Sequence, residues 1–432
     1  MIQILKELIL DAQAAAGDTG VPRRLRMRAL SGKATVLIGV RRSGKSTFML
    51  QIREGLLRQG ISPENILHLN FFDDRLHGLQ PAQILEAYFA LYPEKKDREQ
   101  IHCFFDEIQA LAGWEPFVDR LMRTELCAVY ITGSSAQMLS RELATQMRGR
   151  ALSWEMFPFS FRECLDAKGI SHGRALGSRE RLRVQHAFGT FWESGGFPEV
   201  QGLGASLRVR IHQEYFQSIL FRDLVERHDI PHPRALKDLA HWLLNHIGSL
   251  YTVNSLTGYL KSLGHKVPKT SVSEYLAWLE DAYFLFSVRI YDASLARVNA
   301  NPKKVYCIDH SLAVSVGSGV LVNAGHLLEN LVFIALRSTT PEISYYRTRN
   351  GREVDFVLHR DRSLVQVCET LADPQTRKRE LRALEEAMAE LGQREAVIVT
   401  RGEEELLQLP AGTIRIMPAW RFLLELGDQA AG

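Results

Sequence analysis

Gly39-Val40-Arg41-Arg42-Ser43-Gly44-Lys45-Ser46 fits the phosphate-loop pattern G-x-x-x-x-G-K-[ST] without a mismatch. An apolar, strand-like run at 34–38 precedes it, and a helical pattern of apolar residues at 48–57 follows it. Glycines allow backbone N–H groups to close around phosphates, and the N-terminus of the following helix adds positive potential. A chance glycine-rich turn is the alternative, but the strand–loop–helix context favours a nucleotide-binding loop.

The residues of this loop divide into those that hold phosphates and those that hold a metal ion. Lys45 would place a point charge beside the β- and γ-phosphates, and Ser46 would be a ligand of Mg²⁺. The predicted ATP site consists of Gly39, Arg41, Arg42, Ser43, Gly44, Lys45, Ser46 and Thr47. The sequence therefore predicts ATP and Mg²⁺ as cofactors.

A second apolar run, at 101–107, ends in the acids Asp106 and Glu107. Downstream of a phosphate loop, Asp106 would hold Mg²⁺ through water and Glu107 would polarise the attacking water. The alternative is a strand followed by the acidic N-cap of a helix, since acids are common at helix starts. The domain-scale distance from the phosphate loop favours the catalytic assignment.

A third run, at 127–135, is apolar and ends in small polar residues. A hydroxyl at such a strand end can sense the γ-phosphate, and Thr132 and Ser134 are the candidates. Ordinary strand-to-turn chemistry explains these residues almost as well.

The composition limits the class of protein. With 432 residues, 46% hydrophobic and 24% charged, the chain is expected to be globular, with about three domains. The net charge of +3 is too small to indicate nucleic-acid binding by itself, so local patches must carry that argument. The five cysteines are scattered without metal-ligand spacing, which predicts reduced thiols and a cytoplasmic protein.

Neither a signal sequence nor a membrane span is expected. The apolar stripe near the N-terminus is interrupted by Lys6, Glu7 and Asp11, so it lacks the uncharged core of a signal peptide. The chain has no run of 18 uncharged apolar residues. We therefore expect no membrane partner.

Periodicity divides the chain into segments. Short apolar runs alternate with helical patterns up to about residue 155, which indicates a parallel sheet flanked by helices. The strand patterns then stop, and Ser160 with Glu163 forms a capping box at the start of a helical stretch. The predicted segments are an N-terminal helix with a basic connector (1–30), a phosphate-loop ATPase core (31–155), a helical lid (156–230), a winged helix (231–295) and an α/β domain (296–432).

The segment 231–295 carries three helical patterns and then an apolar, strand-like run at 284–291, as in a winged helix-turn-helix. The second helix of that motif enters the major groove by its N-terminal residues. Here these residues are polar or cationic, namely Lys266, Lys269, Thr270, Ser271 and Ser273. They are predicted to bind DNA. A protein-binding or purely structural module is the alternative, because the local charge is modest.

Six stretches together resemble a known family. They are the phosphate loop at 39–46, Asp106-Glu107, Thr132-Gly133-Ser134-Ser135, and the runs at 159–163, 195–199 and 353–357. They occur in this order in the prokaryotic AAA-type ATPases that carry a C-terminal domain of unknown function. The resemblance covers nearly the whole chain and implies an α/β protein: a parallel-sheet P-loop core with a helical lid, a winged helix and a restriction-endonuclease-like C-terminal domain.

The resemblance also implies a nuclease-like site, from which this sequence departs. A restriction-type site needs an Asp and an acid-x-Lys on the adjacent strand, often with an upstream Glu. Glu329 and Asp355 stand where two acids belong, but Gln366 and Cys368 stand in place of the acid and the lysine. Glu369 cannot substitute, because neighbours on a strand point to opposite faces. We expect a degenerate, inactive site; the alternative is that both acids are ordinary surface or cap residues.

In ATPases of this type, a neighbouring subunit often offers an arginine to the γ-phosphate. The resemblance therefore implies a ring or another homo-oligomer, with Arg148 or Arg150 as the finger. Arg150 is preferred because Gly149 would let the turn expose it. A solvated helix end, or salt bridges with Glu142 and Glu155, is the alternative.

Two functions are compatible with these features. The first is an ATP-driven, DNA-associated protein: a motor, a remodeller or a junction-binding ATPase with an inactive nuclease-like domain. The second is an ATP-gated signalling or defence switch whose C-terminal domains bind a protein partner. DNA-stimulated ATP turnover separates them. An active nuclease is a third function, against which Gln366 and Cys368 argue.

Overall fold

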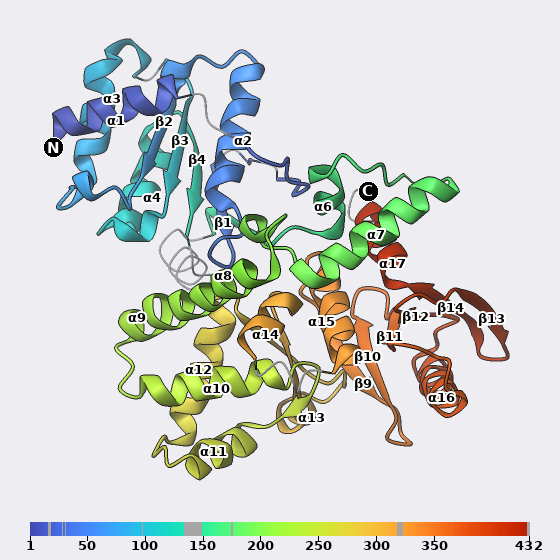
Figure 1. Cartoon of the computed structure of the whole chain (residues 1–432). Coiled ribbons are helices and arrows are strands. Elements are labelled where there is room, and N and C mark those ends of the chain that lie inside the picture. Colours follow the sequence, from blue (N-terminus) through green and yellow to red (C-terminus); the bar gives the residue numbers. More distant parts are fainter. Residues whose placement is uncertain are drawn as a thin grey trace. The chain divides into compact units, whose positions relative to one another are not determined.

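The structure is a computed structural model that describes residues 1–15, 19–27, 29–30, 32–96, 98–133, 149–173, 176–317 and 323–429. It divides into two compact units, Met1–Phe157 and Pro158–Gly432, and each unit is described by itself (Figure 1).

Unit 1 is a parallel sheet covered by helices. Its strands are β1 (Ala34–Ile38), β2 (Ile66–Asn70), β3 (Ile101–Asp106), β4 (Cys127–Thr132) and β5 (Ala151–Glu155). Its helices are α1 (Ile2–Ala14), α2 (Lys45–Arg58), α3 (Ala82–Leu91) and α4 (Trp114–Thr124). The strand order is β2-β3-β4-β1-β5, and neighbouring strands pair in parallel. The predicted parallel sheet of an α/β P-loop core is confirmed.

Both faces of this sheet are buried, which explains why its strands read as continuous apolar runs. Phe104 of β3 stacks on Tyr130 of β4, with ring centroids 4.6 Å apart, in the core cluster that includes Phe48 and Met49 of α2. The next residue, Phe105, instead contacts Phe117 of α4. Successive side chains of β3 thus pack against different helices, as the alternation of a strand requires.

Unit 2 begins with a helical region. It contains α6 (Phe161–Ala167), α7 (Ser178–Ser194), α8 (Ala205–Ser218), a π-helical stretch (Ile219–Val225) and α9 (Glu226–His228). The predicted capping box is present: the Ser160 side chain accepts from the Glu163 backbone N–H, and the Glu163 carboxylate accepts from the Ser160 N–H. No strand falls between 158 and 230 in the described part of the chain.

The tight loop after α7 depends on its glycines. Gly195 has φ +68°, and a Cβ there would lie 2.2 Å from Oδ1 of Asp309. The Gly196 N–H donates to Oδ2 of Asp309 at 2.7 Å, and the Ser311 hydroxyl donates to the Ser194 carbonyl at 2.9 Å. The loop is therefore fixed by the residues that begin α14 (His310–Val316).

Three helices and a small antiparallel sheet follow. The helices are α10 (Pro233–Asn245), α11 (Val253–Ser262) and α12 (Lys269–Asp281), and the strands are β6 (Leu250–Tyr251), β7 (Leu285–Val288) and β8 (Lys303–Cys307). The strand order is β6-β8-β7, and α13 (Leu295–Ala300) connects β7 to β8. The segment boundary drawn from the sequence at 295/296 therefore falls between two strands of one sheet.

The rest of unit 2 is a mixed six-stranded sheet in the order β13-β14-β12-β11-β10-β9. The strands are β9 (Ile343–Arg347), β10 (Glu353–Leu358), β11 (Leu364–Val367), β12 (Glu395–Thr400), β13 (Glu405–Leu409) and β14 (Gly412–Pro418). The helices are α15 (Ala324–Arg337), α16 (Pro374–Leu391) and α17 (Ala419–Gln429). Residues of α16, including Leu384 and Met388, pack with Val354, Leu364 and Ile398 in one buried cluster.

The register of β10 against β9 shifts between Val354 and Val357. Both valines belong to the α16 cluster although three positions separate them, so the irregularity changes the alternation of the strand. Asp355 lies within this shift. The two sheets of unit 2 are also joined, because the Tyr291 N–H donates to the Tyr345 carbonyl at 2.7 Å and the Tyr345 N–H donates to the Arg289 carbonyl at 3.0 Å.

Candidate functional site

The loop between β1 and α2 has the backbone that its sequence predicts. Gly39, Arg42 and Gly44 have φ values of 145°, 64° and 95°, all in the region that L side chains rarely adopt. A Cβ on Gly39 would lie 2.2 Å from the Met156 carbonyl oxygen, so no side chain fits there. Arg42 adopts this backbone without being a glycine, and such a residue costs about 1–3 kcal/mol that the surrounding structure must offset.

The Lys45 side chain contacts the backbone of the loop. Its side chain is buried, and its Nζ donates to the carbonyl oxygens of Gly39 and Val40, both at 3.0 Å. The Ser43 hydroxyl donates to the same Val40 carbonyl at 2.9 Å. The ammonium therefore lies within the loop, against backbone carbonyl oxygens.

The connector that precedes β1 fixes the loop from outside. The guanidinium of Arg23 donates to the carbonyls of Ser43 at 2.6 Å and Phe157 at 2.7 Å. Gln51 of α2 accepts from the Arg23 N–H and donates to the carbonyls of Thr19 and Val21. The sequence analysis identified this connector only as basic. Nothing in its local pattern indicates a contact with residues 20 or more positions away.

Asp106, Glu107 and Thr132 meet at the carboxyl edge of the sheet. The Thr132 hydroxyl donates to Oδ1 of Asp106 and accepts from the Glu107 N–H at 3.0 Å. Both Asp106 and Thr132 are buried. Leu37 of β1 is in register with Thr132, so the strand that leads into the phosphate loop lies next to these residues. Of the two hydroxyls predicted here, Thr132 is in contact with the acids; Ser134 lies outside the described residues.

Glu107 has an unusual backbone for a glutamate. Its φ of 53° and ψ of 46° are left-handed. Its carboxylate accepts from the side-chain amide of Gln109. Strain at a residue that is also a candidate for activating water supports a functional role, since strained backbone clusters at active sites.

The remaining residues of the predicted ATP site surround Lys45. Arg42 and Ser46 are exposed, whereas Arg41, Gly44 and Thr47 are half-buried. Ser46 and Asp106 offer a hydroxyl and a carboxylate, and Mg²⁺ prefers such oxygen ligands. The residues present therefore fit a nucleotide with Mg²⁺.

Arg150 lies at the opposite edge of the sheet, while Arg148 lies outside the described residues. The Arg150 carbonyl accepts from the N–H of Ala34, the first residue of β1. Its side chain is half exposed and makes a long ion pair of 3.4 Å with Asp119 of α4. Ala34 begins the five-residue strand β1, and Gly39 directly follows its last residue. At about 3.3 Å per residue, the backbone of Arg150 is therefore about 17 Å from the start of the phosphate loop. The Arg150 side chain therefore cannot reach the phosphate loop of the same chain.

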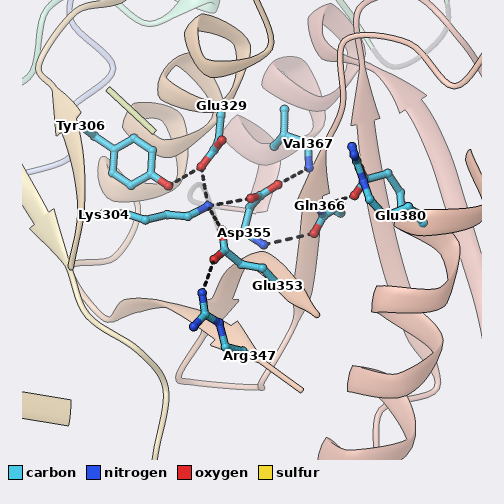
Figure 2. Close-up of polar contacts among 10 residues, drawn as sticks. Lys304, Tyr306, Glu329, Arg347, Glu353, Asp355, Gln366, Val367 and Glu380 are labelled. Atoms are coloured by element: carbon cyan, nitrogen blue, oxygen red, sulfur yellow. Dashed lines mark hydrogen bonds and ion pairs between the residues drawn. The ribbon is translucent and has the colours of Figure 1, made fainter. Parts of the chain in front are cut away.

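A second charged site lies in unit 2 and is shown in Figure 2. The Nζ of Lys304, from β8, lies 2.9 Å from Glu329 of α15, 2.8 Å from Glu353 and 2.8 Å from Asp355 of β10. We call these four residues the lysine–carboxylate cluster. Lys304 is 2% exposed. The Tyr306 hydroxyl donates to the same Glu329 oxygen at 2.6 Å.

The structure brings together three of the four residues predicted for the nuclease-like site. Glu329 and Asp355 share the cluster, and Gln366 lies beside it, accepting from the Asp355 N–H at 3.1 Å and donating to Glu380 at 2.7 Å. Cys368 does not join them, because it packs with the α16 cluster and its Sγ contacts the Thr370 carbonyl.

Although Cys368 stands where the lysine of such a site was expected, the site contains a cation. Lys304 supplies one from another sheet, 25 and 51 positions away from Glu329 and Asp355. The family pattern places this lysine on the strand after Asp355, whereas Lys304 lies before both acids in the chain. Glu353 was also missed as a participant, although the family motif contains it.

The charges of the cluster depend on one another. Burial alone would lower the pKa of Lys304, but the carboxylates of Asp355 and Glu329 raise it well above its ordinary value. Burial and the neighbouring Asp355 carboxylate raise the pKa of Glu329 to about 7. Removal of one partner from a buried ion pair costs about 3–5 kcal/mol, because the other charge is left uncompensated. The charged form of Lys304 is therefore stabilised in its buried position by the neighbouring acids.

Within the described residues, no group of three or more His, Cys, Asp or Glu side chains is arranged to hold a metal ion. All five cysteines lie among the described residues, and none is paired in a disulfide there. No described helix combines the length and apolar character that crossing a membrane requires.

The residues predicted to contact DNA lie at the start of α12. Lys266, Lys269, Thr270 and Ser273 are exposed, and Ser271 is half-buried. Val272, Tyr275 and Leu279 of the same helix are buried. The helix thus presents its polar N-terminal residues to solvent and packs by its apolar face.

Three family profiles match successive parts of the chain. The AAA domain matches residues 31–165, and two domains of unknown function, DUF8612 and DUF4143, match residues 185–321 and 324–422. The chain is 30% identical to the uncharacterized protein MJ1544 of Methanocaldococcus jannaschii, over 98% of this chain and 95% of that protein. It belongs to the AAA-type ATPases with C-terminal domains of unknown function. The predicted family is confirmed.

Other comparisons are weaker. An uncharacterized protein of Haemophilus influenzae is 32% identical over 74% of this chain and 78% of its own length. The ORC1 protein of Aeropyrum pernix, solved in complex with DNA, is 15% identical over 73% of this chain and 90% of that one, with a TM-score of 0.28. PCH-2 of C. elegans is 14% identical over 64% of this chain and 67% of that one, with a TM-score of 0.22. TM-scores this low carry no argument about function.

The contact of Thr132 with Asp106 and Glu107 generates a prediction. We expect Thr132→Val to fold normally and to lower ATP turnover by about 10- to 100-fold, because a hydrogen bond to a charged group contributes about 1.5–3 kcal/mol. Phosphate release at saturating ATP measures the effect. Thr35→Val makes the same change within β1 and is the matched control. Equal turnover in the two variants would contradict the role of Thr132.

Proposed function

We propose that this protein binds and hydrolyses ATP at the carboxyl edge of the unit 1 sheet. The observation that carries the proposal is the adjacency of three strand ends, β3, β4 and β1, which hold the two acids, Thr132 and the phosphate loop. The AAA-type family supports it independently.

Each residue has a distinct proposed role. The Lys45 ammonium exchanges the neutral carbonyls of Gly39 and Val40 for the β- and γ-phosphates, a favourable change because the phosphates are charged. Ser46 and Asp106 would hold Mg²⁺, which neutralises charge on the phosphates when it is bound. Glu107 polarises the attacking water as a general base. Thr132 orients Asp106 and fixes the Glu107 backbone.

Substitution of Lys45 and Glu107 should separate binding from turnover. We expect Lys45→Ala to lose ATP binding, because the phosphates lose their main cation. Glu107→Gln should keep binding and lose turnover, because only the activation of water is removed. Fluorescent-nucleotide titration and phosphate release measure the two effects. Unchanged turnover in Glu107→Gln would refute its proposed role.

We propose further that the active form is a homo-oligomer, a ring or another assembly, in which Arg148 or Arg150 reaches the γ-phosphate of a neighbouring subunit. The position of Arg150 at the edge of the sheet opposite its own phosphate loop supports action in trans. Its ion pair with Asp119 is long and half exposed, so it contributes little and can be exchanged for a phosphate.

Mixing two inactive variants tests the arginine. Arg150→Ala and Lys45→Ala subunits should each be inactive alone. Mixed oligomers should regain some turnover, because some interfaces pair an intact loop with an intact arginine, and a finger contributes about 10³–10⁵ in rate. Asp119→Ala removes the ion-pair partner while keeping the arginine, so it is the control that should remain active. If co-assembled mixtures regain nothing, Arg150 is not a finger in trans.

We propose that unit 2 binds DNA through α12. Three helices with an antiparallel β6-β8-β7 sheet form a winged-helix arrangement, and the exposed Lys266, Lys269 and Thr270 lie at the N-terminus of its third helix. That terminus adds positive potential to the lysines, which suits phosphate contacts. A motor, remodeller or junction-binding ATPase would couple such binding to hydrolysis.

The Lys266→Ala/Lys269→Ala variant tests this surface. We expect its DNA affinity to fall to a similar extent on all sequences, and the slope of log K against log salt to fall by about one to two units. Lys261→Ala/Lys303→Ala removes the same charge elsewhere in the module and is the matched control. ATP turnover with duplex, single-stranded and branched DNA completes the test. An unaltered slope with no DNA stimulation would favour a switch that binds a protein partner.

We propose that the last part of unit 2 is a silent nuclease-like domain. The element order α15-β9-β10-β11-α16-β12 and the position of Glu329, Asp355 and Gln366 around one point support the relation. Gln366 in place of an acid removes one anionic metal ligand.

A further inference from the structure

The Lys304 ammonium lies at the point where a metal ion of a nuclease site would lie, among three acidic side chains. An ammonium group has three N–H donors and accepts nothing. Here three carboxylates, those of Glu329, Glu353 and Asp355, lie 2.8–2.9 Å from Nζ. The carboxylates converge on this nitrogen from a helix and a strand, as Figure 2 shows. The donors of Lys304 and the acceptors around it are therefore equal in number.

From this geometry we propose that the Lys304 ammonium is a built-in substitute for a divalent cation and keeps metal ions out of the lysine–carboxylate cluster. The inference deepens the nuclease-like part of the proposed function. It depends neither on ATP hydrolysis nor on DNA binding, because it concerns only what the carboxylates hold.

The surrounding contacts favour this assignment over an ordinary surface ion pair. The second oxygen of Asp355 already accepts from the Val367 N–H at 2.9 Å, and Glu329 accepts from Tyr306. Both acids are thus aimed at Nζ by fixed neighbours, as the ligands of a metal ion are aimed by their outer contacts. Gln366 is neutral, and its side-chain amide donates to Glu380. Gln366 therefore adds no negative charge to the cluster, so the single positive charge of Lys304 needs no second cation beside it.

The lysine is also tethered where it is. Lys304 lies on the central strand of the β6-β8-β7 sheet, in register with Leu250 on one side and Val288 on the other. Its ammonium can leave the carboxylates only if the side chain finds another buried partner or β8 leaves the sheet. A tethered cation is present at a high effective concentration, whereas a metal ion must be bound from solution. The wild-type cluster should therefore exclude divalent cations at ordinary concentrations.

The test is Lys304→Gln, which keeps most of the side-chain volume and removes the charge. Mn²⁺ is the probe, followed by loss of its free electron paramagnetic resonance signal and by melting temperature. Every protein compared, including the one called wild type here, also carries Asp106→Asn, so that Mn²⁺ at the proposed ATP site does not contribute to the signal. Lys303→Gln, one residue earlier on β8, is the matched control for charge loss.

We expect Lys304→Gln to melt at a lower temperature than wild type without metal. Mn²⁺ should then bind it at one site about tenfold or more tighter than in wild type, and raise its melting temperature by several degrees. Adding Asp355→Asn should abolish both effects. Lys303→Gln should behave as wild type.

Two results would overturn the inference. One is folded Lys304→Gln that binds Mn²⁺ no better than wild type. The other is wild type that binds Mn²⁺ in the cluster, seen as binding or plasmid nicking that Asp355→Asn removes. If Lys304→Gln folds only with Mn²⁺, the inference is supported. If it does not fold at all, Lys304→Ala takes its place, because it keeps all three carboxylates and leaves space for a hydrated ion; failure of folded Lys304→Ala to bind Mn²⁺ better than wild type would also overturn the inference.

Discussion

A charge that is buried away from water must be matched inside the protein, and this constraint organises both candidate sites. In unit 1 the buried Lys45 donates to two backbone carbonyls, and the buried Asp106 accepts from a hydroxyl. In unit 2 the buried Lys304 is matched by three acidic side chains, Glu329, Glu353 and Asp355. The difference determines what each site can do. Neutral partners can be exchanged for a charged ligand with a gain in free energy, whereas three carboxylates cannot be exchanged for anything that a solution readily supplies.

The same constraint explains which parts of the protein could be predicted from its sequence. Short local patterns mark the phosphate loop, the acids at the end of β3 and the hydroxyl at the end of β4. A parallel sheet brings the carboxyl ends of its strands to one edge, so these residues meet whatever the length of the chain between them. The apolar runs identified these strands because both faces of the sheet are buried. The capping box at Ser160 is equally local. The family and the α/β fold could therefore be predicted from the sequence, and so could the residues that meet at the candidate nucleotide site.

Contacts between distant segments could not be predicted from local sequence patterns. Arg23 lies 20 positions from Ser43 and 134 from Phe157, and only the folded chain places its guanidinium between the two carbonyls. Lys304 was missed for a more specific reason. A local pattern places the lysine two positions after Gln366, on the strand next to Asp355, because a sequence motif records only spacing along one strand. The protein supplies the charge from β8 instead. The strands β13 and β14 and helix α17 were missed because no motif marked them.

Lys304 also connects two parts of unit 2 that the sequence analysis treated separately. Its backbone belongs to the small sheet beside α10–α12, and its side chain belongs to the cluster formed with α15 and β10. Because an uncompensated buried charge is costly, any movement that drew β8 away from β10 would have to overcome about as much as breaking a buried ion pair, roughly 3–5 kcal/mol. The stacked rings of Tyr306 and Phe333, 4.2 Å apart, add apolar contact at the same junction. The cluster therefore has a mechanical role as well: its ion pairs hold the small β6-β8-β7 sheet on the mixed sheet.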